Sequence, residues 1–265
     1  MATWTLPEGT AVISGASSGI GETFARALAG RGHDLILTAR RAERLHELAG
    51  ELESAYGVRV EIVAADLATD EGLAKVEEAV SSVERLALLI NNAGFGVGRS
   101  FSQAPVADHE AMVRVHVLAS MRLMHAALNR MRDGRGGAII NVSSVASFLT
   151  RGGGPNYSGT KAYLNVFSQN LAGQVAKYDV KVQALCPGFT TTEFHAAMRV
   201  GDGERPPYPR WLWLSADEVV EMSLAALPRG RVIVVPGWQY KVFRLLLALG
   251  LGGLTQARRG IAKRL

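Results

Sequence analysis

The sequence predicts a single α/β domain: a doubly wound, parallel sheet of about seven strands with helices on both faces. Short apolar segments rich in β-branched residues alternate with longer segments whose apolar residues recur at helical spacing. Such alternation is typical of parallel strands joined by right-handed helical crossovers. No linker, internal repeat or low-complexity segment divides the 265 residues, so we expect one domain over residues 1–239 and a tail over residues 240–265.

Seven short apolar segments bounded by turn-forming residues are predicted to be the strands: residues 10–14, 34–38, 60–65, 86–90, 138–142, 180–185 and 231–235. The segment 86–90 contains only Leu, Ala and Ile, so it is expected at the centre of the sheet, where both faces are buried. Helices are predicted near residues 21–28, 44–51, 71–83, 111–131, 157–177 and 216–227.

The composition is that of an ordinary globular protein, with 48% hydrophobic and 20% charged residues. Cys186 is the only cysteine, so no intrachain disulfide can form, and no metal site is expected. The N-terminus lacks the features of a signal peptide, and the longest apolar run, residues 245–254, is far shorter than the ~20 residues of a membrane span. We therefore expect a cytoplasmic protein.

The net charge of +5 belongs to the C-terminal part of the chain. Residues 228–265 contain eight Lys or Arg and no Asp or Glu, so the preceding chain has a balance of −3. A nucleic-acid-binding protein would be basic throughout its chain, so this distribution of charge does not predict nucleic-acid binding. The apolar, basic tail suits peripheral contact with an anionic membrane; the alternative is a helix docked on its own domain or on a partner subunit.

A glycine-rich turn between the first strand and the first helix predicts a phosphate-binding site. Gly15 permits a tight turn, Gly19 allows close approach of the backbone, and Gly21 lets helix and strand pack together. Ser17, Ser18 and Ile20 complete this turn, and the helix N-terminus offers free N–H groups to a phosphate.

Polar residues follow the other strands at the edge where the glycine turn is expected. Arg40 and Arg41 follow the second strand, and arginine there suits the 2′-phosphate of NADP(H), whereas an acidic residue would suit NAD(H). The alternative is that one of these arginines only opens the following helix. Later strands lead into Asp66-Leu67 and into the segment 91–94, Asn91-Asn92-Ala93-Gly94.

Tyr157 and Lys161 are predicted to lie one turn apart on the same face of a helix. A nearby cation favours the phenolate, so the pKa of Tyr157 is expected to fall towards the range useful for proton transfer near neutral pH. Ser143 and Ser144 end the strand just upstream. Taken alone, the pair could equally be a surface tyrosine and a solvated lysine.

Together these motifs resemble those of the short-chain dehydrogenase/reductase family over about residues 6–236. The matching residues, in family order and spacing, are Gly15, Gly19, Gly21, Asn91, Asn92, Ala93, Gly94, Ser144, Tyr157, Lys161, Pro187 and Gly188. The resemblance implies a Rossmann-type fold, NADP(H) as cofactor, hydride transfer between the nicotinamide and a carbonyl or alcohol carbon, and a homodimer or homotetramer.

The resemblance also implies a role for each residue. Tyr157 would be the general acid/base, Ser144 would hydrogen-bond the substrate oxygen, and Lys161 would hold the nicotinamide ribose. Asp66 would contact the adenine, and Thr190 and Thr192 would hold the carboxamide and phosphates. The family usually has an asparagine where this chain has His116, which is either a proton relay or a histidine satisfied within the helices.

The segment 192–214 is expected to cover the nicotinamide as a lid with an aromatic wall, which suits a hydrophobic ketone or secondary alcohol. Its residues Phe194, Met198, Tyr208, Trp211 and Trp213 would face Phe95, Phe148 and Leu149. Alternatively, these aromatic residues belong to the core or to a contact between subunits. Two other functions stay open: a 3-oxoacyl-thioester reductase and a non-catalytic NADP(H)-sensing or scaffold protein.

Overall fold

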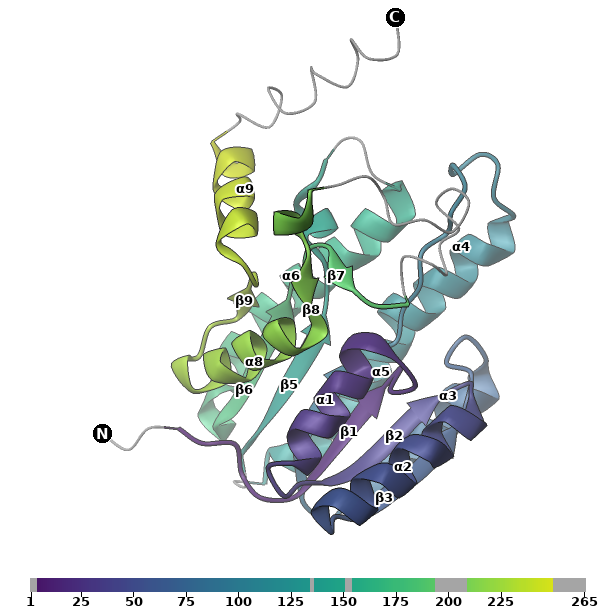
Figure 1. The fold of residues 1–265 in the computed structure, drawn as a ribbon, viewed down its shortest axis with the longest axis vertical. Coiled ribbons are helices and arrows are strands. Elements are labelled where there is room, and N and C mark those ends of the chain that lie inside the picture. The colour runs from purple at the N-terminus through teal and green to yellow at the C-terminus, as the bar shows by residue number, and fades with distance from the viewer. Residues whose placement is uncertain (1–3, 134–135, 151–153, 194–208, 250–265) are drawn as a thin grey trace, which may run out of the picture.

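A computed structural model describes residues 4–133, 136–150, 154–193 and 209–249, and its centre is a wholly parallel seven-stranded sheet (Figure 1). The strand order is β3-β2-β1-β4-β5-β6-β9. The strands are β1 (Thr10–Ser14), β2 (Asp34–Ala39), β3 (Val60–Ala64), β4 (Leu86–Asn91), β5 (Gly137–Val142), β6 (Val180–Leu185) and β9 (Ile233–Val234). The predicted doubly wound α/β fold is confirmed, with β4 at the centre.

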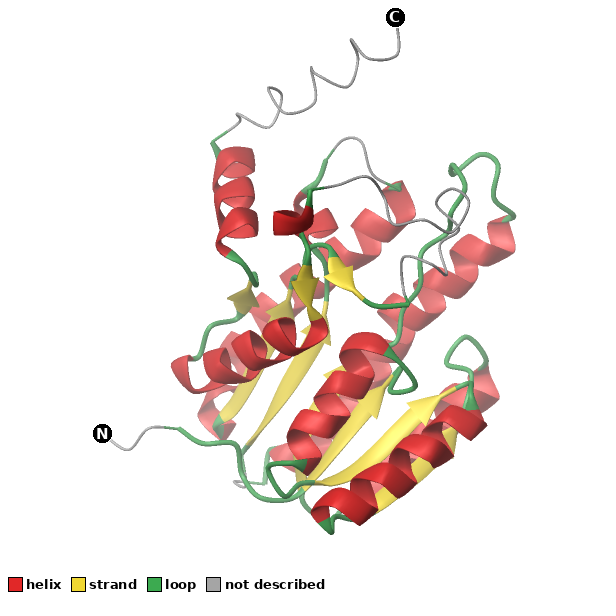
Figure 2. Ribbon diagram, viewed as in Figure 1, coloured by secondary structure: helices red, strands yellow, loops and turns green. Residues whose placement is uncertain are grey.

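Helices cover both faces of the sheet (Figure 2). One face packs against α1 (Gly19–Ala29), α2 (Ala42–Tyr56) and α8 (Ala216–Ala226). The other packs against α3 (Asp70–Ser82), α5 (Ser120–Met131) and α6 (Pro155–Val175). A small second sheet pairs β7 (Thr190–Thr191) with β8 (Leu214–Ser215).

Two separate apolar cores follow from the alternation of side chains along the strands. Ile13 and Leu88 belong to the core beneath α1, α2 and α8, whereas Val12 and Leu89 belong to the core on the opposite face. All four are fully buried. Successive residues of a strand point to opposite faces, so a strand covered on both sides must be apolar throughout. This is why the pattern of residues 86–90 predicts a central strand.

The predicted helix 111–131 differs from the structure in its middle. Helix α4 (Val106–Val113) continues into a π-helical segment, Arg114–Ala119, which then continues as α5. A π-helical turn has one more residue than an α-helical turn, and such turns often mark functional sites. His116 lies in this segment and is buried. Apolar spacing could not reveal the segment, because one wider turn barely disturbs a helical pattern.

The strand register brings the predicted site residues to one edge of the sheet. Ser14 pairs with Thr38, Asn91 with Asn141, and Val142 with Leu185, so the strands end nearly level. The loops that follow these strands therefore leave the same edge of the sheet. In open α/β sheets ligands bind at this carboxyl edge.

Helix α9 (Trp238–Ala248) follows β9 and extends away from the sheet (Figure 1). The proposed boundary between residues 239 and 240 falls inside this helix, and Gln239 and Tyr240 are both buried against the domain. Residues 250–265 of the predicted tail lie outside the described residues. Within the described part of the chain, no helix is long and apolar enough to cross a membrane.

Candidate active site

Ser144, Tyr157 and Lys161 are brought together where β5 meets α6. The Ser144 hydroxyl is hydrogen-bonded to the phenol of Tyr157. Lys161 Nζ donates to the carbonyl oxygen of Val142, the last residue of β5, over 2.8 Å. Ser143 Oγ donates to the Lys161 carbonyl oxygen over 2.8 Å, so the second serine fastens the helix to the strand.

The predicted fall in the pKa of Tyr157 is wrong for the protein as described here. Burial raises the pKa of the Tyr157 phenol to about 12, and the hydrogen bond from Ser144 opposes this only in part. Burial also lowers the pKa of the Lys161 ammonium to about 8. The Lys161 nitrogen lies 5.8 Å from the centre of the Tyr157 ring. Removal from water disfavours the charged form of each group.

His116 is held between two partners in the π-helical segment. Its Nε2 accepts from the backbone N–H of Phe95 over 3.0 Å, so the ring proton lies on Nδ1 and faces Thr160 Oγ1, also at 3.0 Å. Thr160 Oγ1 in turn donates to the carbonyl oxygen of Tyr157. Burial and then the charge of Lys161 lower the pKa of His116 well below 6.5. Both contacts therefore position the ring as a neutral group.

The glycine turn adopts a backbone conformation that depends on its glycines. Gly15 and Gly19 have φ values of +68° and +59°, in the left-handed region that favours glycine. A Cβ on Gly21 would lie 2.3 Å from the Gly15 carbonyl oxygen, so this position has no room for a side chain. Ser18 precedes α1 in an extended conformation, and Ile20 packs against the core. The backbone N–H groups at the start of α1 thus face the carboxyl edge.

Ser14 and Asn92 fix this turn against β4, and the sequence did not reveal the part played by Ser14. The Ser14 hydroxyl accepts from the backbone N–H groups of Asn92 and Ala93, each over 3.0 Å. Asn92 Nδ2 donates to the carbonyl oxygens of Ser14 and Gly15. Asn92 therefore shapes the phosphate turn with its side chain. Gly94 follows and approaches His116 closely, since a Cβ there would lie 2.8 Å from its Nε2.

Arg41 is the arginine that the structure brings to the glycine turn. Its guanidinium donates to the hydroxyl and the carbonyl oxygen of Ser17 over 3.1–3.2 Å. It also pairs with Glu193 at 3.1 Å. Arg41 is the N-cap residue of α2, directly before the helix, and the side chains of both Arg40 and Arg41 are exposed. Thus the residue that opens the helix is also the one that reaches the turn.

Asp66 and Leu67 form the rim of the edge beside β3. Asp66 Oδ1 accepts from the backbone N–H of Ala68, and the Asp66 carbonyl oxygen accepts from Thr69. Leu67 is buried beneath them. The backbone of the turn is thereby fixed.

The segment from Pro187 to Thr192 closes the edge from the other side. The Pro187 carbonyl oxygen accepts from Val145, next to Ser144. Thr190 Oγ1 donates to the Gly188 carbonyl oxygen, and the Thr192 side chain lies against Gly19, 3.0 Å from where a Cβ would stand. This segment thus links the glycine turn to the Ser144 turn.

Tyr240 supports this segment from behind, a role that the sequence did not reveal. Its hydroxyl accepts from the Phe189 N–H over 2.8 Å and donates to the Leu212 carbonyl oxygen. A Cβ on Gly188 would lie 2.0 Å from its ring. The first turn of α9 therefore ties the segment Pro187–Thr192 to Leu212, near the end of the predicted lid.

Comparison with known proteins places this geometry in a family. The short chain dehydrogenase family matches residues 9–202. The chain belongs to the short-chain dehydrogenase/reductase family. A curated relative, the 3-oxoacyl-(acyl-carrier-protein) reductase of Aquifex aeolicus (strain VF5), is 31% identical over 86% of this chain and 96% of its own length.

Solved structures of short-chain dehydrogenase/reductases superpose on nearly the whole chain. A short-chain dehydrogenase from Sphingobium yanoikuyae, in complex with NADPH, is 33% identical with a TM-score of 0.81, covering 97% of this chain and 96% of that one. The bulky-bulky ketone specific alcohol dehydrogenase from Comamonas testosteroni is 30% identical with a TM-score of 0.78, covering 99% and 96%. The chain is thus an oxidoreductase of this family, whose substrate has to be argued separately.

The structure describes only part of the predicted aromatic wall. Phe194, Met198 and Tyr208 lie outside the described residues. Trp211 is 60% exposed and stacks on Trp238, and Trp213 packs on Phe189 with ring centres 5.3 Å apart. For these two indoles, both the lid and the alternative, a place in the core or in a contact between subunits, stay predictions.

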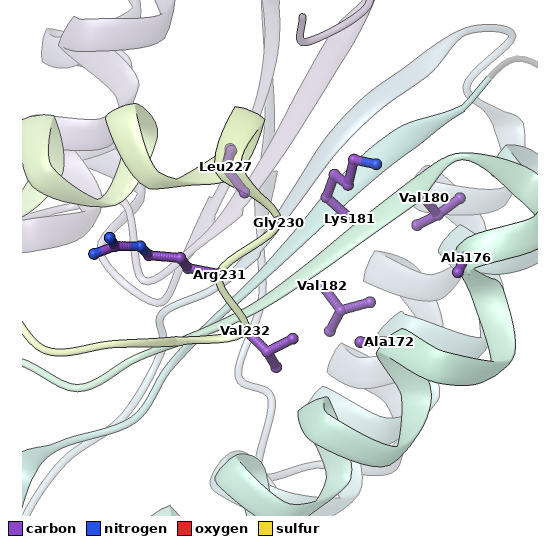
Figure 3. A pocket seen from close by; sticks show the side chains of 9 residues that line it. All are labelled: Ala172, Ala176, Val180, Lys181, Val182, Leu227, Gly230, Arg231 and Val232. Atoms are coloured by element: carbon purple, nitrogen blue, oxygen red, sulfur yellow. The ribbon is translucent and has the colours of Figure 1, made fainter. Parts of the chain in front are cut away.

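A pocket at the opposite end of the sheet contains none of the predicted site residues (Figure 3). It lies between the end of α6, the amino end of β6 and the loop before β9, and is lined by Ala172, Ala176, Val180, Lys181, Val182, Leu227, Gly230, Arg231 and Val232. Ligands of doubly wound sheets bind at the carboxyl edge. We therefore assign the pocket no part in the reaction.

His116→Asn is expected to make stability less dependent on pH. In the native chain the unfolded state takes up a proton on His116 below pH 6.5 while the folded state does not, so the free energy of unfolding should decrease as the pH falls below that value. Urea unfolding over a pH series measures this slope, with exposed His125→Asn as the control. An unchanged slope in His116→Asn would contradict the assignment of a neutral, buried ring.

Tyr240→Phe keeps the ring against Gly188 but removes both hydrogen bonds of the hydroxyl. Leaving the Phe189 N–H without this partner costs about 1–3 kcal/mol. We expect a lower melting temperature and, because the Pro187–Thr192 segment loses its support, a several-fold higher KM for NADPH. Tyr56→Phe, at an exposed tyrosine, is the control. A stability loss with unchanged KM would mean that the tether serves folding alone.

Proposed function

We propose that the protein is an NADP(H)-dependent carbonyl reductase or alcohol dehydrogenase for hydrophobic ketones or secondary alcohols. The observation on which this rests is the cluster of Ser144, Tyr157 and Lys161 at the carboxyl edge of the sheet, in which Lys161 is buried and the other two side chains are half-buried. A binding protein would gain nothing from withdrawing a phenol and an ammonium from water side by side, because this disfavours the charged form of each group. The NADPH complex of the Sphingobium relative and the ketone specificity of the Comamonas relative support the same proposal.

The residues at the edge fit a dinucleotide. Gly15 and Gly19 have left-handed backbone conformations, and Gly21 has no room for a side chain. The turn therefore presents backbone groups and no side chains at these positions, next to the start of α1, where a phosphate would bind. Arg41, beside Ser17, would hold the 2′-phosphate by charge-assisted hydrogen bonds, and Arg40 adds positive charge at the rim. The segment Pro187–Thr192 would close over the carboxamide and phosphates, and Asp66 would border the adenine.

NADP(H) supplies or accepts the hydride when bound, and the protein supplies placement and the proton. In reduction, Tyr157 donates its phenolic proton to the carbonyl oxygen as the carbon gains the hydride, which gives the alcohol. In oxidation, Tyr157 takes the alcohol proton. Ser144 donates a hydrogen bond to the same oxygen and stabilises the charge that develops there.

Lys161 serves two purposes in this proposal. Its ammonium stabilises the phenolate that Tyr157 becomes after proton donation, and it contacts the nicotinamide ribose. Because the pKa of Lys161 is about 8, the side chain is mostly but not fully charged near neutral pH. His116, neutral and held by Phe95 and Thr160, positions the start of α6 and relays no proton.

A second candidate substrate class is a 3-oxoacyl thioester, favoured by the 31% identity to the Aquifex reductase. The same proton transfer would then occur at the 3-oxo group of a thioester-linked chain.

A homodimer or homotetramer and a cytoplasmic location stay predictions.

Tyr157→Phe is expected to lower kcat by about 100- to 10,000-fold, the usual contribution of a general acid. NADPH oxidation, followed by absorbance with panels of hydrophobic ketones, acyl thioesters and quinones, measures this loss and ranks the substrate classes. Tyr163→Phe, six residues further along α6, is the control variant. Absence of turnover with every compound by the wild-type protein would favour the non-catalytic sensor.

Arg41→Ala is expected to raise the Kd for NADPH by about tenfold or more, since a hydrogen bond to a charged group contributes about 1.5–3 kcal/mol. Binding of NADH should change little, because NADH lacks the 2′-phosphate. Arg40→Ala is the matched comparison, with a smaller effect expected because the hydrogen bonds to Ser17 come from Arg41. Fluorescence titration of both cofactors separates these cases. Equal losses of NADPH and NADH binding in Arg41→Ala would refute a 2′-phosphate site.

A further inference from the structure

The outer face of α9 is an exposed apolar stripe. Trp238, Val242, Leu245 and Leu249 have exposed fractions of 70%, 47%, 58% and 63%. They are spaced by four, three and four residues, which places them on one face of a helix. Scattered exposed apolar residues are ordinary, but a contiguous stripe marks an interaction site.

The opposite face of α9 is fastened to the domain, so the stripe cannot turn inward. Tyr240 is buried and bonded to Phe189 and Leu212, and Gln239 Nε2 donates to the Trp211 carbonyl oxygen over 3.2 Å. The helix extends outward from the domain (Figure 1). The stripe therefore faces away from the domain and is accessible to a binding partner.

A second exposed indole widens the stripe. Trp211 is 60% exposed and stacks on Trp238, with ring centres 6.2 Å apart and planes 14° from parallel. Tryptophan is enriched where protein meets the boundary between lipid headgroups and water, because its ring is apolar and its N–H is polar.

The charges around the stripe are all of one sign. Lys241 is exposed on α9 beside the stripe, whereas the Arg244 guanidinium lies over the Phe148 ring, 5.2 Å from its centre. The sequence beyond Leu249 adds four basic residues and no acidic residue, and residues 228–265 as a whole contain none. Each basic residue near an anionic membrane adds to the attraction between protein and lipid.

We propose that the outer face of α9, with Trp211, binds the surface of an anionic membrane. The helix would lie in the plane of the headgroups, with the stripe inserted and the basic residues beside the lipid phosphates. The other candidate occupant is a second copy of the chain. A two-fold contact through this face would place the basic residues of one copy against those of the other without acidic partners from the same region, and so the charge favours lipid.

Co-sedimentation of the full-length protein with vesicles tests the proposal. Vesicles of phosphatidylcholine mixed with phosphatidylglycerol should pellet the protein, and vesicles of phosphatidylcholine alone should pellet much less. The variant V242S/L245S/L249S should lose more than about tenfold in partitioning, since it removes most of the apolar surface that would insert among the lipids. The variant K241Q should lose the preference for phosphatidylglycerol in part.

The control variant is Y56S/V106S/M222S, which removes three exposed apolar side chains from other helices and should pellet like the wild type. Thermal unfolding checks that each variant is folded. Three results would overturn the proposal: no pelleting of wild-type protein, equal pelleting on both vesicles, or unchanged pelleting of V242S/L245S/L249S. Light scattering after size exclusion tests the alternative, that a second copy of the chain binds this face. If V242S/L245S/L249S forms a smaller assembly than the wild type, and the wild type does not pellet with vesicles, the stripe is an interface between subunits.

Discussion

The hydrogen bond from Lys161 to the Val142 carbonyl oxygen is the contact on which the arrangement of the site depends. It joins the first turns of α6 to the end of β5, and Ser143 strengthens the junction from the strand side. Tyr157 lies one helical turn before Lys161, so fixing the lysine also fixes where the phenol can lie. Ser144 follows Ser143 directly and thereby comes within hydrogen-bonding reach of that phenol.

Burial decides the protonation of this cluster. A phenol with a pKa of about 12 is protonated near neutral pH and can act as an acid, while an ammonium with a pKa of about 8 can still lose its proton. Both shifts favour the neutral forms, because removal from water penalises charge. The attraction between ammonium and phenolate matters mainly once the proton has left Tyr157.

The closing segment of the site is supported from distant parts of the chain. Thr192 packs on Gly19, Glu193 pairs with Arg41, and Tyr240 holds Phe189 from behind. The contact between Thr192 and Gly19 lies at the glycine turn, whereas the contact between Tyr240 and Phe189 lies at the first turn of α9. A single helix thus combines a buried face that supports the site with an exposed face of apolar and basic residues.

Local periodicity was enough to predict the fold and to bring Tyr157 and Lys161 to one side of a helix. Residues 86–90 predict a central strand, and the spacing of Tyr157 and Lys161 predicts a shared helical face, because both depend only on local periodicity. The direction of the Tyr157 pKa shift, the π-helical turn around His116 and the tether from Tyr240 became apparent only in the folded chain. Each of these depends on burial or on contacts between segments far apart in the chain, and local patterns contain no information about either.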